Sequence, residues 1–198
     1  MGKRIASEGL LLAERGVGPL LQRDYWGVVR NPRAAPRAVM ATVRRYFPSF
    51  SPRDLASFER CDGRDAELSV GDEIYVTLPV AGRFLVCVTH VGDQAFTLAT
   101  EPGHPEAGRI TFGCYHNAEG ELVFHIRSRA RSSTRRFRAG FLATGEVMQT
   151  STWTDFVNRV GVAFGDGIDG FIHAETTECP DEPEGIASSA PTFLTAGD

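Results

Sequence analysis

The sequence has few cysteines, no excess of positive charge and no long apolar run, and each absence argues against a class of protein. Its four cysteines contain no CxxC pair, which argues against a zinc site; they are Cys61, Cys87, Cys114 and Cys179. A formal net charge of −4 argues against a general nucleic-acid binder, because phosphate binding needs a basic surface. No apolar run approaches the ~20 residues that span a bilayer. We therefore expect neither nucleic-acid binding nor integral membrane association.

Other motifs are also missing. No GxSxG motif marks a nucleophile, and we expect no cofactor. His173 and Glu175 alternate within the segment IHAET but have no evident third ligand, so we expect no metal. The apolar part of the N-terminal sequence is too short for a signal peptide, because Glu14 and Arg15 interrupt it. Together these features predict a cytoplasmic protein with reduced thiols.

The length of 198 residues predicts one domain with tails. We expect an N-terminal arm with one short helix over residues 1–24, a folded domain over 25–177 and an acidic, disordered tail over 178–198. Within the domain, YWGVVR from Tyr25 predicts a first strand. Val39, Val43 and Phe47 recur at helical spacing after Pro36, and Ser51-Pro52 predicts a second short helix reaching Phe58.

From Leu68 onward the apolar period changes to two. Strands are predicted at 72–78, 83–90, 95–100, 109–115 and 121–128, and their close spacing favours an antiparallel meander. A helical period returns near 135–149, and its strongest part is the apolar stripe Trp153, Phe156, Val157, Val160 and Phe164. An interruption is expected between Gln149 and Thr152. This order predicts an α+β fold in which a curved antiparallel sheet wraps around a C-terminal helix, with a cavity between them.

The segment 101–133 predicts a β-hairpin whose register is chosen by burial. When Tyr115 pairs with Glu121, the apolar residues of both strands share one face; these are Ile110, Phe112, Cys114, Leu122, Phe124 and Ile126. That pairing needs a glycine bulge, which Gly120 can supply. The apolar face should then meet the C-terminal helix. His125 and Arg127 should lie on the outer face, with His125 half-exposed.

The hairpin sequence, GHPEAGRITFGCYHNAEGELVFHIRSRARSS, with GDEIYV before it and a capped aromatic helix after it, resembles a known family. It is similar, from about Leu20 to Thr177, to the uncharacterised domain-of-unknown-function family nineteen-ninety. The element Gly103-His104-Pro105-Glu106-x-Gly108 is the most specific part of the resemblance. The resemblance implies a relation to the helix-grip superfamily of START lipid-transfer domains and birch-pollen-allergen-like proteins. Members of that superfamily typically hold an apolar ligand between sheet and helix.

Two groups of polar residues are candidates for chemistry. His104 and Glu106 could form a proton-handling pair at the mouth of a cavity, or they could simply fix the loop through backbone contacts. The arginines near the hairpin exit could bind an anionic group, or they could pair with the acidic tail; the anion-binding candidates are Arg129, Arg131, Arg135 and Arg136.

Three functions remain open at this point. The first is binding of a small apolar or amphipathic ligand, with a cavity wall formed by Phe84, Val86, Phe112, Phe124, Ile126, Phe141, Met148 and Trp153. The second is an acid–base enzyme on the same scaffold, a hydrolase, isomerase or cyclase, using His104 and Glu106. The third is a protein-interaction module without a pocket. A cavity of several hundred Å³ would support the first two, and a fully packed interior would support the third.

Overall fold

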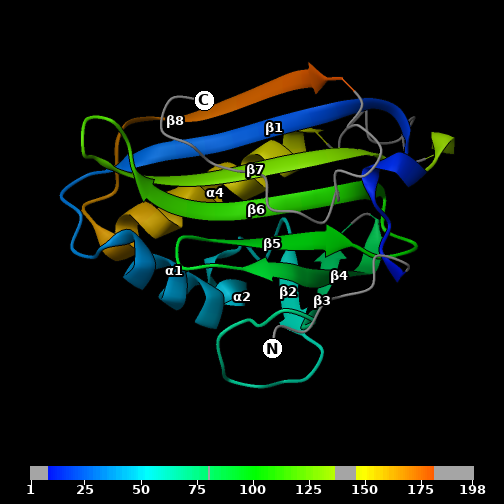
Figure 1. Ribbon diagram of the computed structural model, residues 1–198, viewed down its shortest axis with the longest axis horizontal. Helices are drawn as coiled ribbons and strands as arrows, with labels where there is room; N and C mark the ends of the chain where they lie inside the picture. The colour runs from blue at the N-terminus through cyan, green and yellow to red at the C-terminus, as the bar shows by residue number, and fades with distance from the viewer. Residues whose placement is uncertain (1–8, 80, 137–145, 181–198) are drawn as a thin grey trace.

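In the computed structural model, which describes residues 9–79, 81–136 and 146–180, an antiparallel sheet wraps around a long helix (Figure 1). The strands of this sheet are β1 (Val17–Val29), β2 (Ser57–Arg60), β3 (Glu73–Leu78), β4 (Gly82–Val91), β5 (Ala95–Thr100), β6 (Glu106–His116), β7 (Leu122–Ser132) and β8 (Ile168–Cys179). Their order across the sheet is β2-β3-β4-β5-β6-β7-β1-β8. Helix α4 (Glu146–Phe164) crosses one face. The α+β helix-grip fold is thus confirmed.

Helix α4 is held against the sheet by the apolar stripe that its sequence predicts. Phe156, Val157 and Val160 are completely buried. The predicted interruption near residues 149–152 is wrong, because α4 continues through it. The hydroxyl of Thr152 donates to the carbonyl of Met148 at 2.7 Å, so this polar side chain is satisfied within the helix. Most of the helix predicted over 135–149 lies outside the described residues.

Two short helices follow the first strand, as predicted, but the second is placed differently. Helix α1 (Pro36–Arg45) begins at its proline and buries Val39, Met40 and Val43. Helix α2 (Phe47–Phe50) comes directly after it. The helix predicted from Ser51 to Phe58 is wrong: the Ser51 hydroxyl donates to the carbonyl of Ala56 at 2.7 Å, and the chain then enters β2.

Aromatic side chains fill the space between α1, α2, α4 and the sheet. The ring of Phe47 lies 5.2 Å from that of Phe112 and 5.6 Å from that of Phe156, measured between centroids. The Phe112 ring stacks on that of Phe96 at 4.9 Å. These rings pack against one another and form the aromatic part of the core.

The β6–β7 hairpin has the predicted faces but a different pairing. Tyr115 lies opposite Val123 rather than Glu121. The shift is two residues, and an even shift leaves every side chain on its predicted face. The loop is closed by Asn117, whose side-chain oxygen accepts from the amide of Glu121 at 2.8 Å. Gly120 has the positive φ, +81°, that the predicted bulge requires.

The two ends of the described chain add to the sheet. Strand β1 begins at Val17, inside the segment expected to be an arm. Leu10 and Leu12 pack on Cys87 and Ala99, and a 3-10 turn (Ala13–Arg15) leads into β1. Strand β8 pairs with β1 at the sheet edge and carries the IHAET segment. Residues 181–198, most of the predicted acidic tail, lie outside the described residues. Among the described helices, none has the length and apolar character needed to cross a bilayer.

Candidate functional site

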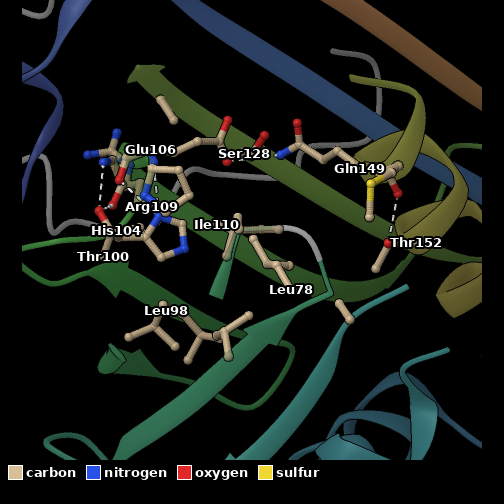
Figure 2. Close-up of a pocket in the computed structure, with 18 of the residues that line it drawn as sticks. Leu78, Leu98, Thr100, His104, Glu106, Arg109, Ile110, Ser128, Gln149 and Thr152 are labelled. Atoms are coloured by element: carbon tan, nitrogen blue, oxygen red, sulfur yellow. Dashed lines mark hydrogen bonds between the residues drawn. The ribbon is translucent and has the colours of Figure 1, made fainter. Parts of the chain in front are cut away.

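A cavity of about 770 Å³ lies between the sheet and the first half of α4 (Figure 2). Strands β2 to β7 contribute apolar side chains such as Leu78, Leu98 and Ile110. Helix α4 contributes Met148 and Trp153. Since the aromatic cluster around Phe47 fills the other end of this space, the cavity is confined to the end near the His104–Glu106 loop.

Only some of the eight residues predicted as the cavity wall line the cavity. Val86, Met148 and Trp153 line the cavity. The side chains of Phe112, Phe124 and Ile126 belong to the packed core, where all three are completely buried. Phe84 packs its ring edge-to-face on His104 at 5.4 Å. Phe141 lies outside the described residues.

His104 lines the cavity, but its ring is held by backbone atoms. Its Nδ1 lies 3.0 Å from both the amide nitrogen and the carbonyl oxygen of Glu106, so the ring contacts this backbone in either tautomer. The side chain is 8% exposed, and this burial lowers the pKa of His104 to about 4. At neutral pH the ring is therefore uncharged. Its contact with the backbone of Glu106 fixes the turn into β6.

The carboxylate of Glu106 has different partners from the His104 ring. Its Oε1 accepts from Nη1 of Arg23 at 3.2 Å, and its Oε2 accepts from Nε2 of Gln149 at 3.2 Å. Burial raises the pKa of Glu106, while Arg23 and Gln149 oppose the rise. Through these two contacts, Glu106 links β1 and β6 to the first half of α4. The three side chains form a polar end to the cavity. Sequence reasoning missed Arg23, because it precedes the segments that carried the motif.

Three further polar atoms belong to the cavity lining. Ser128 and Trp153 are 3% and 9% exposed. Within the described residues, Oγ of Ser128, Oε1 of Gln149 and Nε1 of Trp153 are buried and have no hydrogen-bond partner. A buried polar atom without a partner is unfavourable. In this cavity, a bound molecule or water can satisfy such atoms.

The four arginines predicted as an anion site do not share one location. Arg136 lines the cavity and is exposed. Ser128 and Ala130 line the cavity from β7, so the alternating Arg129 and Arg131 face the other side of the sheet. The guanidinium of Arg131 donates to the carbonyl of Gly18. Arg135 is exposed.

A model of the family described as "Domain of unknown function (DUF1990)" matches residues 29–159. The chain belongs to this family. The match includes the His104–Glu106 loop and the half of α4 that lines the cavity, whereas Arg23 and strand β8 lie beyond its limits. No curated protein is similar to the chain in sequence.

Several solved structures resemble the DUF1990 chain in part. A hypothetical protein of Helicobacter pylori is 7% identical, with a TM-score of 0.49, over 71% of this chain and 86% of that one. A protein of Nitrosospira multiformis is 15% identical, with a TM-score of 0.48, over 72% and 95%. A norcoclaurine synthase mutant of Thalictrum flavum is 13% identical, with a TM-score of 0.46, over 71% and 96%.

On the outer face of the DUF1990 sheet, His125 and Arg127 form an ionic cluster with Asp24 from β1. His125 and Arg127 are 5% and 7% exposed, so the prediction that His125 is half-exposed is wrong, although both residues lie on the predicted face. Nε2 of His125 lies 2.7 Å from Oδ1 of Asp24. Nearby, His173 of β8 stacks on Trp26 at 4.7 Å. No group of three potential metal ligands occurs among the described residues.

The buried ring of His104 predicts a pH dependence of stability. In the unfolded chain the ring takes up a proton below its ordinary pKa of 6.5, whereas the folded protein resists protonation down to about pH 4. Its contribution is therefore fully present above pH 6.5 and falls as the pH drops, by up to about 3 kcal/mol. Urea unfolding between pH 4.5 and 7.5 measures this. A His104→Asn variant keeps an acceptor for the Glu106 amide but does not titrate, so its stability should depend less on pH.

The exposed His116 supplies the matched control for this prediction. A His116→Asn variant should keep the pH dependence of the wild type. If His104→Asn and the wild type lose the same stability between pH 7.5 and 4.5, the ring of His104 is not buried in its neutral form.

Proposed function

We propose that this protein binds a small apolar or amphipathic ligand in the cavity between the sheet and α4. The observation that carries the proposal is the cavity itself. Its volume of about 770 Å³ falls within the range of ~300–1,000 Å³ that is typical of small-molecule sites. Its walls are mostly apolar, with polar groups gathered around Glu106. An empty apolar space of this size would weaken the packing of the domain, because its lining loses contacts.

The other two functions receive less support from the same geometry. A cavity of this size argues against an interaction module without a pocket. Acid–base catalysis by His104 and Glu106 would require the two side chains to act together. The ring of His104 instead contacts the backbone of Glu106, while the Glu106 carboxylate contacts Arg23 and Gln149.

Filling the cavity should weaken ligand binding. Ile110 is half-buried on the cavity face of β6, so an Ile110→Trp variant should place its larger side chain in the cavity. We expect the affinity for the neutral fluorescent probe N-phenyl-1-naphthylamine to fall about tenfold or more, because part of the apolar space is no longer available. Fluorescence titration measures this affinity.

A Val162→Trp variant is the control, since Val162 lies 60% exposed on α4. It adds the same indole outside the cavity and should bind the probe as the wild type does. Native mass spectrometry of protein purified from its own host should detect a retained ligand. Equal probe affinity in the wild type and Ile110→Trp would show that the probe binds elsewhere.

A further inference from the structure

The polar end of the cavity has a defined arrangement across three strands and one helix. Ser128 of β7 lies directly opposite Arg23 of β1 on one side and Ile110 of β6 on the other. The carboxylate of Glu106 joins Arg23 to Gln149 of α4. Figure 2 shows the labelled Ser128 between Glu106 and Gln149. The polar groups at this end are thus close neighbours.

Arg23 and Glu106 form an ion pair at this end of the cavity, whose lining also includes Arg109 and Arg136. The guanidinium of Arg23 is 3% exposed and pairs with the Glu106 carboxylate, whose side chain is 18% exposed. A ligand carboxylate placed here would face the Glu106 carboxylate, and a ligand ammonium would face the Arg23 guanidinium. Like charges at close range in a buried site repel strongly. The polar end therefore favours a ligand group without charge.

The three lining atoms without partners among the described residues determine the hydrogen bonds that such a group must make. Oε1 of Gln149 only accepts, so the ligand must donate to it. The hydroxyl of Ser128 can donate, so the ligand can accept from it. Nε1 of Trp153 offers a second donor in the same lining. A hydroxyl group both donates and accepts, whereas an ether oxygen or a carboxylate only accepts.

We propose that the ligand is an apolar molecule with an uncharged hydroxyl, or a similar group that both donates and accepts, which binds between Ser128 and Gln149. This inference rests on the proposed function, because it concerns the same cavity. The hydroxyl supplies the partners that Ser128 and Gln149 do not find among the described residues. The rest of the ligand lies against the apolar walls formed by residues such as Leu98 and Ile110.

A series of ten-carbon molecules that differ only in the polar group tests the inference. The probes are 1-decanol, decyl methyl ether, decanoate and decylamine, each measured by displacement of N-phenyl-1-naphthylamine. We expect 1-decanol to bind about tenfold more tightly than the ether, which lacks the donor, and more tightly than either charged molecule. Preference for decanoate would overturn the inference and would indicate the exposed Arg136 instead. Equal binding of all four would also overturn it.

A serine substitution makes the test specific to the polar end. A Ser128→Ala variant should weaken 1-decanol binding about fivefold, and it should also weaken binding of the ether, because the oxygen of either molecule can accept from the Ser128 hydroxyl. Because the Ser128 hydroxyl has no partner within the described residues, the ligand-free variant should be as stable as the wild type in urea. The control is Ser57→Ala, a strand serine outside the cavity lining, which should change neither affinity. An unchanged affinity for 1-decanol in Ser128→Ala would overturn the inference.

The outcomes separate this inference from the proposed function. If N-phenyl-1-naphthylamine binds but the polar group of the displacing molecule has no effect, the cavity binds ligands and only the hydroxyl inference fails. If neither the fluorescent probe nor any ten-carbon molecule binds, both fail.

Discussion

Replacing Asp24 by alanine is expected to lower the free energy of unfolding at pH 7 by about 3–5 kcal/mol, because it removes the carboxylate from a buried ionic cluster. Asp24 is 8% exposed. Its Oδ1 accepts from Nε2 of His125 at 2.7 Å and from Nε of Arg127 at 2.5 Å, and its Oδ2 accepts from Gln22 at 2.9 Å. Without the carboxylate, the buried guanidinium of Arg127 loses its ion pair with Asp24. Urea unfolding at pH 7 measures the loss.

The Asp24 carboxylate also makes the free energy of unfolding depend on pH. Burial alone would raise the pKa of Asp24, but hydrogen bonds from His125 and Arg127 outweigh burial and hold the pKa below its ordinary value of 3.8. The stabilisation is therefore present above pH 3.8 and is lost as the pH falls through the lower pKa of the folded protein.

Two variants show whether burial causes the effect of Asp24→Ala. Asp155 also pairs with an arginine, Arg159, at 2.6 Å, but its side chain is 36% exposed. Asp155→Ala should therefore cost less than about 1 kcal/mol. Combining Asp24→Leu with Arg127→Met removes both charges and should recover most of the lost stability. The explanation fails if Asp24→Ala costs no more than Asp155→Ala.

The position of His125 illustrates what strand alternation can and cannot predict. Alternation placed Phe124 and Ile126 toward the helix and His125 toward the outside, and each side chain lies on its predicted face. Alternation does not say what covers a face. Asp24, which contacts His125, comes from a strand about a hundred residues earlier, so no local pattern predicts the contact.

Strand alternation also could not predict where the cavity lies. Phe112 and Phe124 do face the helix, but α1 and α2 bring Phe47 against this part of the sheet and fill it. The cavity begins where these helices no longer reach. The periodicity of a strand carries no information about that boundary. Strand alternation could have identified Ser128 as a candidate site residue. It is a polar residue at an inward position of β7, between Ile126 and Ala130.

Gly108→Ala is expected to cost about 4 kcal/mol, combining backbone strain of ~1–3 kcal/mol with overpacking of similar size. Gly108 has φ +157°, and an added Cβ would lie 2.2 Å from the carbonyl oxygen of Arg129 and 2.7 Å from Cα of Ala130. Both atoms belong to the backbone of β7, so they cannot move without disturbing the β6–β7 ladder. Thermal and urea unfolding of the variant measure the cost.

Gly103 distinguishes the two contributions to that cost, because it also has a positive φ but lies in the loop just before β6. Its φ is +97°, but an added Cβ would have no atom within 4 Å. Gly103→Ala should therefore show backbone strain alone, about 1 kcal/mol. The difference between the two variants measures the close contact between β6 and β7, which holds the start of β6 and Glu106 at the polar end of the cavity. Equal losses in the two variants would mean that β7 yields to the added methyl group, and that this contact does not position Glu106.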